Sequence, residues 1–325
     1  TACMMVGVIG CAALSAPSSW RMFLVIFVIA KVGYSASLIF YDAMLSDVTV
    51  PERMDQVSSQ GYAWGYIGSC VPFVVSLLFV LGNEAIGISM PAAMAIAFLL
   101  NAGWWFGGTV PLLKTYKQRH GVAKKEHVIR ESFGRLFKIL HDMKGERKIF
   151  LFLVAFFFYI DGVYTIIEMA TAYGSAIGLD TQGLLLALLV TQIVAFPCAL
   201  LFGKAAKKYK NTALIKVCIV SYFFIALFAI QLDKQWEFWL LAVCVGMFQG
   251  GIQALSRSYF ASIIPPEKSG EFFGIFDICG KGASFVGTAL VGVMTQVTRN
   301  PGSGVGMLAV LFAAGFILFG IAARE

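Results

Sequence analysis

The stretch DVTVPERMDQVSSQGYAWGYIGSCVPF, residues 47–73, is echoed by SIIPPEKSGEFFGIFDICGKGASFVG, residues 262–287. Each stretch ends a long apolar run, turns at a Pro-Glu pair followed by a basic residue, and enters a second apolar run rich in glycine. Two similar halves that run in the same direction are typical of many secondary transporters. The repeat is loose, with an offset between the turn and the glycines, so it supports this architecture only together with the hydropathy of the chain.

The composition indicates that lipid is the natural solvent of this chain. Of its 325 residues, 59% are hydrophobic and 13% are charged, whereas a soluble domain carries about 25% charged residues. So few polar side chains could not cover the surface of a water-soluble fold. The chain opens at Thr1 within an apolar segment that no basic stretch precedes. We therefore expect a truncated product that has lost an N-terminal piece, and not a signal peptide.

Apolar runs long enough to cross a bilayer as helices recur along the chain. They do not alternate as the strands of a membrane barrel would. The sequence therefore predicts an all-α polytopic membrane protein with about ten transmembrane helices. The predicted spans are 2–15, 21–45, 60–82, 88–112, 149–174, 183–204, 212–232, 236–258, 270–296 and 304–323. Two pairs of small residues, Gly61 with Gly65 and Gly246 with Gly250, predict close helix contacts.

Lysine and arginine are distributed unevenly among the predicted turns. They crowd into 114–148 and 204–210, whereas the opposite turns hold only Arg21, Lys234 and Arg299. The positive-inside rule therefore gives the orientation. The segments expected in the cytoplasm are 46–59, 114–148, 204–211 and 259–269. Much of the net charge of +7 is then orientation signal and attraction to anionic membrane lipid, and we expect no nucleic-acid partner.

The segment 114–148 is the one long linker, and it divides the chain into 1–113 and 149–325. Within it, EHVIRESFGRLFKILHDM, residues 126–143, spaces its apolar residues as a helix does. This pattern predicts a basic amphipathic helix that lies along the cytoplasmic membrane face. The first part would hold four helices and the second six. A symmetric repeat needs two more helices at the front, so the intact protein should have twelve.

Several strings also resemble a known family. They are FYDAMLSD at 40–47, QGYAWGYIGS at 60–69, FYIDGVYTI at 158–166, QIVAFPCALLFGKAAKKYK at 192–210, GGIQALSRSYFASIIP at 250–265 and GEFFGIFDICGK at 270–281. In order and content they resemble the vacuole-effluxer-like branch of the major facilitator superfamily, whose fungal members are vacuolar amino-acid effluxers. The resemblance covers most of the chain. It implies a major facilitator fold of two pseudo-symmetric six-helix bundles, with the first two helices missing here.

One segment departs from the superfamily pattern. The stretch 203–210 resembles its basic cytoplasmic turn between helices eight and nine. Ala206, Lys207 and Lys208 stand where an acidic residue is common, which puts the usual charge-relay role of this turn in doubt.

Asp161 and Glu168 are the leading candidates for a transport site. They are seven residues apart, which is two turns of one predicted helix, with Tyr164 on the same side. A charge inside a bilayer costs about 2.5–3.5 kcal/mol, so it should face a cavity or a partner. We expect either an acidic stripe that binds a proton or a cationic group, or a helix-packing carboxylate hydrogen-bonded to backbone or hydroxyl groups.

Two further helices present polar faces. Lys31 and Tyr34 share a face of the predicted helix 21–45, where Lys31 would hold a substrate carboxylate, balance Asp161, or extend to the outer interface. Gln249 and Gln253 step by four along another helix, as hydrogen-bonding groups for a polar solute or for a neighbouring helix.

The pair Asp277 and Lys281 has the i, i+4 spacing of an ion pair within one helix. The simpler interpretation is a static pair that neutralises both charges, and the sharper one is a pair that breaks during transport. At the cytoplasmic end we expect gate residues, and Arg257 would pair there with Glu267, Glu271 or helix-end carbonyls. The predicted gate residues are Asp42, Asp47, Arg53, Lys208 and Arg257.

The sequence carries no signature of an enzyme. Its histidines, His120, His127 and His141, all lie in the basic linker, and no phosphate-binding loop occurs. The seven cysteines show no metal-like spacing. We therefore expect no catalytic residues, no metal site and no cofactor.

We expect a secondary transporter, as a monomer, that moves a small polar solute by alternating access. Protons are the expected coupled ion, and amino acids are favoured by the family resemblance alone. The alternatives are a non-transporting membrane scaffold or receptor, and a lipid flippase. The short loops favour a bacterial plasma membrane over a vacuolar one.

Overall fold

Helices follow one another along the computed structural model, which describes residues 1–16, 19–120 and 146–324. Within this described part, nine helical segments are long and apolar enough to cross a membrane, and the shorter apolar helix α1 precedes them. No strand occurs among the described residues. The prediction of an all-α membrane protein is confirmed. The predicted amphipathic helix at 126–143 lies outside the described residues.

The long helices have the following bounds: α1 (Ala2–Ala13), α2 (Trp20–Ala43), α4 (Met54–Leu81), α6 (Met90–Thr115), α8 (Arg147–Ala176), α9 (Thr181–Ala205), α10 (Asn211–Ala229), α11 (Gln235–Ile263), α12 (Ser269–Thr298) and α14 (Leu308–Ala322). The short elements are α3 (Leu45–Val48), η1 (Pro51–Arg53), α5 (Asn83–Ile86), η2 (Pro266–Lys268) and α13 (Pro301–Gly306).

Several helices extend beyond their apolar runs. The span predicted at 60–82 begins at Met54, and the span predicted at 236–258 continues to Ile263. Hydropathy alone missed the start of α4 because its first turns are polar. It missed the end of α11 because Ser256, Arg257 and Ser258 interrupt the apolar run. The last predicted span, 304–323, is divided between α13 and α14 at Met307.

The two echoing stretches form the same local structure. Each Pro-Glu turn is a single 3-10 turn, η1 or η2, with proline in its first turn, and a long helix follows directly. Proline suits this place because its fixed φ matches that of a helix start. It has no backbone N–H, but an N–H in the first turn would have no acceptor within the helix, so nothing is lost. The turns therefore begin α4 and α12 in equivalent ways.

The described chain divides into two compact units. The first contains Thr1–Val48 and Ile67–Arg119, and the second contains Thr49–Tyr66 and His120–Glu325. The boundary thus falls inside α4, whose first half belongs to the second unit. Within the first unit, α1 packs against α2 and α6. The backbones of α1 and α2 approach closely, because a Cβ at Gly33 would lie 2.6 Å from the backbone nitrogen of Gly7.

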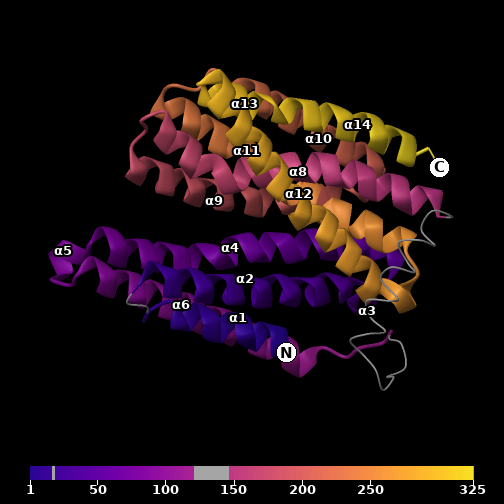
Figure 1. Ribbon diagram of the computed structural model, residues 1–325. Coiled ribbons are helices and arrows are strands. Elements are labelled where there is room, and N and C mark those ends of the chain that lie inside the picture. The colour runs from indigo at the N-terminus through magenta and orange to yellow at the C-terminus, as the bar shows by residue number, and fades with distance from the viewer. Residues whose placement is uncertain (17–18, 121–145, 325) are drawn as a thin grey trace. The chain divides into compact units, whose positions relative to one another are not determined.

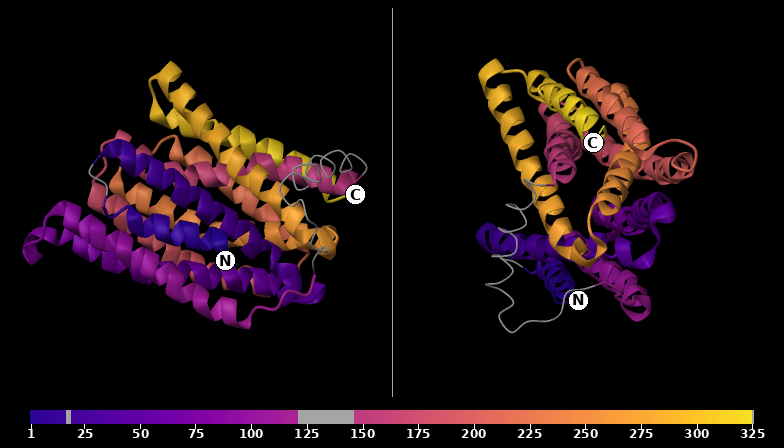
Figure 2. Two further views of the ribbon diagram at one scale, coloured as in Figure 1. Left: turned by 60° about the horizontal axis from the view of Figure 1, so that its bottom comes forward. Right: turned by 90° about the vertical axis from the view of Figure 1, so that its right-hand side faces the viewer.

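The second unit is built around α8, which contacts both α12 and α14. Figures 1 and 2 show α12 crossing α8 obliquely, while α14 runs alongside α8. Aromatic side chains fill the core, where Phe156 stacks on Phe276 with ring centroids 4.1 Å apart. The predicted Gly246–Gly250 contact is present, since a Cβ at Gly250 would lie 2.7 Å from that of Ala199 on α9. A Cβ at Gly65 would meet no described atom within 4 Å, so the Gly61–Gly65 prediction of close packing is wrong at that residue.

Candidate functional site

Asp161 lies on α8 where α12 crosses it, and only 1% of its surface is exposed. Its Oδ1 accepts a hydrogen bond of 2.9 Å from the backbone nitrogen of Gly287 and one of 3.3 Å from the Thr165 hydroxyl. Its Oδ2 is buried and has no hydrogen-bond partner among the described residues. One oxygen of this carboxyl group therefore bonds to backbone and hydroxyl groups, as expected for a carboxylate that packs two helices together. The second oxygen is left without the partner that a structural carboxylate normally has.

The backbone of α12 comes close to Asp161 because residue 287 is glycine. A Cβ at this residue would lie 2.9 Å from Cγ of Asp161 and would collide with Oδ1 and with the Thr165 hydroxyl. Gly287 therefore leaves room for the carboxylate and also supplies it with a backbone donor. Sequence reasoning identified Asp161 and missed this partner, which lies 126 residues along the chain.

Glu168 and Tyr164 follow Asp161 along α8. Glu168 is exposed and makes no hydrogen bond or ion pair with the described residues, whereas Tyr164 is half-buried beside Gly280 of α12. Seven helical residues correspond to roughly 10 Å along the helix axis. One face of α8 thus carries a buried carboxyl group and, two turns further, an accessible one.

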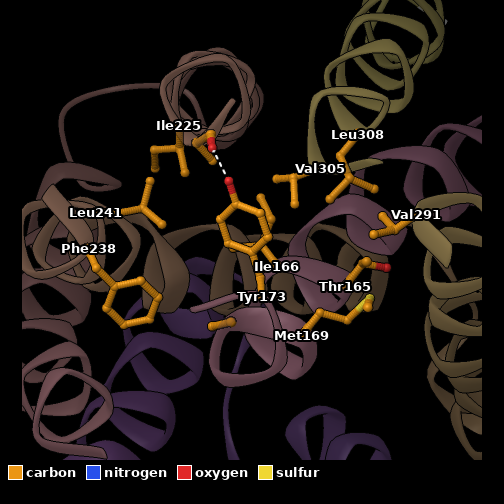
Figure 3. A pocket seen from close by; sticks show the side chains of 12 residues that line it. Thr165, Ile166, Met169, Tyr173, Ile225, Phe238, Leu241, Val291, Val305 and Leu308 are labelled. Carbon is orange, nitrogen blue, oxygen red and sulfur yellow. Dashed lines mark hydrogen bonds between the residues drawn. The ribbon is translucent and has the colours of Figure 1, made fainter. Parts of the chain in front are cut away.

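A small apolar cavity lies next to Thr165 in the second unit (Figure 3). It measures about 30 Å³ and is lined by α8, α10, α11, α12, α13 and α14. Across it the Tyr173 hydroxyl donates a 2.6 Å hydrogen bond to the backbone oxygen of Ala229, drawn as a dashed line in Figure 3. The rest of the lining is almost entirely apolar, as at Ile225 and Val305. Such a cavity gives little hydration to the neighbouring carboxyl group.

The polar face predicted on α11 contacts the first half of α4. Nε of Arg257 donates a 3.0 Å hydrogen bond to the Ser58 hydroxyl, and its Nη2 donates one of 3.1 Å to the Ser58 carbonyl. Its guanidinium carbon lies 4.7 Å from the ring centroid of Tyr62. Arg257 is 3% exposed, and its predicted pairing with Glu267 or Glu271 stays a prediction.

The two glutamines continue this contact along α11. The Tyr66 hydroxyl donates a 3.1 Å hydrogen bond to Oε1 of Gln253. Oε1 of Gln249 is buried and has no partner among the described residues. Gln253 therefore bonds to a neighbouring helix, which is one of its two expected roles, while the role of Gln249 stays a prediction.

Sequence reasoning missed a second polar group where α4 begins. The Asp55 carboxylate accepts a 2.5 Å hydrogen bond from the Ser258 hydroxyl and another from the Asn211 side chain at the start of α10. The Asn211 amide also reaches the carbonyl of Leu255 at 3.3 Å. The three helices α4, α10 and α11 thus meet at Asp55, although its partners lie more than 150 residues away.

Asp277 and Lys281 form the predicted ion pair within α12, with Nζ of the lysine 2.6 Å from Oδ1 of the aspartate. Their side chains are 15% and 32% exposed, respectively. Whether this pair breaks during transport stays a prediction.

The first unit contains the remaining candidates. Nζ of the exposed Lys31 lies 5.8 Å from the ring centroid of Tyr34, which meets Trp105 edge-on at 5.7 Å. Lys31 and Asp161 belong to different units, so their pairing across a cavity stays a prediction.

Two predicted gate residues on the first unit are less exposed. Asp42 is half-buried and Asp47 is buried. Oδ2 of Asp47 accepts a hydrogen bond from the Tyr116 hydroxyl, and Oδ1 accepts one of 3.2 Å from the backbone nitrogen of Arg119. Burial, together with the hydrogen bond and the negative charge of Asp47, raises the pKa of Tyr116 above its ordinary value. In the second unit, Arg53 and Lys208 are exposed.

The family of this chain follows from comparison with known sequences. A family model described as vacuole effluxer Atg22 like matches residues 1–325. An uncharacterised MFS-type transporter of Bacillus subtilis, YxiO, is 40% identical over 308 residues, which cover 94% of this chain and 72% of that protein. Autophagy-related protein 22-1 of Aspergillus clavatus is 26% identical over 298 residues, covering 82% of this chain and 49% of that protein. The chain thus spans about half the length of this fungal relative.

Solved structures support the same fold. The E. coli fucose:proton symporter FucP matches 99% of this chain and 82% of its own, with a TM-score of 0.70 and 11% identity. The human organic anion transporter MFSD10 matches 98% of this chain and 75% of its own, with a TM-score of 0.66 and 14% identity. At such identities the likeness shows the major facilitator fold alone. Together with the full-length family match and the bacterial relative, it establishes that the chain belongs to the vacuole effluxer Atg22-like family, as an integral membrane transporter of the major facilitator type and not an enzyme.

Proposed function

We propose that the chain works as a secondary transporter that moves a small polar solute by alternating access and couples this movement to protons. Amino acids are the first candidates, because the family resemblance connects this branch with vacuolar amino-acid effluxers. The fucose:proton symporter among its structural neighbours shows the same fold used for proton coupling. The bacterial relative supports a plasma membrane as the location.

The observation that carries this proposal is the buried carboxyl group of Asp161. An anion with one uncompensated oxygen is costly in a poorly hydrated site. Protonation removes the charge and makes Oδ2 a potential donor, while Oδ1 keeps its bonds to Gly287 and Thr165. A carboxyl group that gains and loses a proton as its surroundings are hydrated or closed is the element that proton coupling requires.

Glu168 supplies the route for that proton. It is accessible, and it lies two turns along α8 from Asp161 in the direction predicted to face outward. A proton would first reach Glu168 and then Asp161 when the intervening face of α8 becomes hydrated. This arrangement gives the two acids different roles, with Asp161 as the coupling group and Glu168 as an entry group.

Uptake of labelled amino acids into proteoliposomes tests the proposal. An imposed pH gradient should drive accumulation, and an ionophore that collapses the gradient should reduce uptake to equilibration. Amino acids, peptides, nucleosides and sugars should first be screened for thermal stabilisation of the protein, since a bound solute stabilises the folded state. Accumulation that is unaffected by collapse of the pH gradient would contradict proton coupling. Uptake that only reaches equilibration, with or without the gradient, would indicate facilitated diffusion instead.

A further inference from the structure

We propose that a groove between α10 and α11 binds one acyl chain of a phosphatidylethanolamine molecule, whose headgroup lies on the turn that joins the two helices. The groove measures about 340 Å³, and ligand pockets in proteins measure about 300–1,000 Å³. The inference depends neither on proton coupling nor on the solute. It rests on the chain being an integral membrane protein, because lipid is then the molecule that surrounds this surface.

The groove is built from two helix faces whose side chains are almost entirely apolar. Phe224 on α10 and Leu240 on α11 form its walls, with 62% and 46% of their surfaces exposed. Ile225 and Leu241 form its floor, and both are buried. A polar solute would find almost no hydrogen-bonding groups here. A hydrocarbon chain fits such a surface, because close packing holds apolar groups together within a bilayer.

The groove runs along the two helices and ends near their connection. Its lining residues lie within 221–228 on α10 and 240–248 on α11, which corresponds to roughly 10–12 Å along each helix axis. The turn 230–234 joins these helices on the side predicted to face outward. Trp236, which follows the turn, is 61% exposed, as is typical at the level of lipid headgroups. An acyl chain inserted along the groove therefore places its headgroup at this turn.

The turn carries charges of both signs. Asp233 and Lys234 are exposed, and their backbone nitrogens donate hydrogen bonds of 3.1 and 3.3 Å to the Glu237 carboxylate. The Lys234 ammonium can pair with the lipid phosphate, and the Asp233 carboxylate can accept from the primary ammonium of ethanolamine. Phosphatidylglycerol would bring only negative charge to a turn with two carboxylates. The quaternary ammonium of phosphatidylcholine has no N–H to donate, so phosphatidylethanolamine matches the turn best.

The floor of the groove is also a wall of the small cavity beside Thr165. Ile225 and Leu241 line both spaces, so a single layer of side chains separates the bilayer from that cavity. Figure 3 shows these two residues to the left of Tyr173 and Thr165 to its right. Thr165 in turn donates a hydrogen bond to Asp161. A bound acyl chain therefore covers and supports the wall of the cavity next to the candidate transport site.

Native mass spectrometry of the full chain tests the lipid site. The protein is purified in a mild detergent and titrated with phosphatidylethanolamine, phosphatidylglycerol and phosphatidylcholine that carry identical acyl chains. We expect one phosphatidylethanolamine to bind each protein chain more tightly than either of the other lipids. Cys244→Phe places a ring in the groove and should weaken this binding by about tenfold, because the acyl chain is then excluded.

Val217→Phe is the matched control. Val217 lies one helical turn before the groove on α10 and is 52% exposed, so the same ring is added outside the groove lining. Lipid binding should be unchanged in this variant. If Cys244→Phe lowers the unfolding temperature strongly, Ser221→Phe is a second variant that fills the groove, from α10, and should weaken binding in the same way.

Asp233→Asn tests the headgroup contact separately. It removes the charge that faces the ethanolamine ammonium and should abolish the preference for phosphatidylethanolamine over phosphatidylcholine, while one lipid still binds in the groove. The same substitution should leave the unfolding temperature without lipid close to that of the original chain, because Asp233 is exposed.

Equal lipid binding by Cys244→Phe and Val217→Phe would overturn the site, because the retained lipid would then lie elsewhere. Phosphatidylglycerol or phosphatidylcholine bound as tightly as phosphatidylethanolamine by the original chain would also overturn the proposal. Binding is measured without solute and without a pH gradient. The lipid site can therefore fail while Asp161 keeps its proposed role, and Asp161 can fail while the lipid site stands.

Discussion

The backbone nitrogen of Gly287 donates a 2.9 Å hydrogen bond to Oδ1 of Asp161, and this bond joins α12 to α8 at a buried carboxyl group. It orients the carboxyl group while its second oxygen stays without a described partner. The same crossing of two helices thus holds the acid in place by one oxygen, and the other oxygen is where we propose that the coupled proton binds.

Gly287→Ala should disturb this crossing strongly. The added methyl group would collide with Oδ1 of Asp161 and with Thr165, and overpacking of this kind typically costs about 1–3 kcal/mol. We expect a lower unfolding temperature in detergent and a loss of pH-driven uptake. The control is Gly292→Ala on the same helix, where a Cβ would meet no described atom within 4 Å. Equal effects of the two substitutions would show that Asp161 is not constrained by residue 287.

If Asp277 and Lys281 neutralise each other on α12, removing both charges should cost less stability than removing the lysine charge alone. Lys281→Met leaves the Asp277 charge without its lysine partner, and we expect a destabilisation of about 2–3 kcal/mol, comparable to the cost of a charge at a helix centre. Asp277→Asn combined with Lys281→Met removes both charges and should restore most of the stability, as measured by thermal unfolding.

Transport by this double variant separates the two interpretations of the pair. A static pair predicts uptake close to that of the original chain. A pair that breaks and re-forms during transport predicts a stable protein with little uptake. If the double variant is as unstable as Lys281→Met, both interpretations are contradicted. Asp277 and Lys281 would then not neutralise each other.

Tyr116→Phe should remove the hydrogen bond that Asp47 receives near the end of α6. The expected loss is about 1–2 kcal/mol, because a buried carboxylate loses a donor. Since the pKa of Tyr116 is raised by burial and by Asp47, the contribution of this residue should be complete below the ordinary tyrosine value of about 10. It should be lost as the pH rises through the higher folded-state pKa.

Unfolding temperatures of the two proteins at several pH values check this prediction. The difference between the original chain and Tyr116→Phe should be constant between neutral pH and about 9 and should shrink only above about 10. A difference that falls already near neutral pH would show that the Tyr116 hydroxyl is not the donor that stabilises Asp47.

The fold could largely be predicted from the sequence because a helix that crosses a bilayer must be apolar for most of its length. Hydropathy placed the spans, and the polar turns around Ser58 and Tyr259 were missed because they are helical without being uniformly apolar. The local pair of Asp277 and Lys281 could be predicted, since i, i+4 spacing alone brings two side chains together.

The partners of the site could not be predicted in the same way. Asp161, Gln253 and Arg257 could be identified as candidates because they are polar residues in apolar helices. Their partners, Gly287, Tyr66 and Ser58, lie more than 120 residues away, and one sequence carries no direct record of such contacts. The four-residue spacing from Ser58 to Tyr66 was the one available signal, and it becomes meaningful only beside Gln253 and Arg257 on α11.

The most direct test of the account compares two activities of Asp161→Asn in proteoliposomes. Asparagine keeps the oxygen that accepts from Gly287 and cannot release a proton. We predict that solute exchange between equal pH values continues, while uptake driven by a pH gradient and solute-induced proton entry, followed with an internal pH dye, are both lost. Glu168→Gln should slow the proton-driven activities without abolishing them. Unchanged proton entry and gradient-driven uptake in Asp161→Asn would contradict the central claim that this carboxyl group carries the coupled proton.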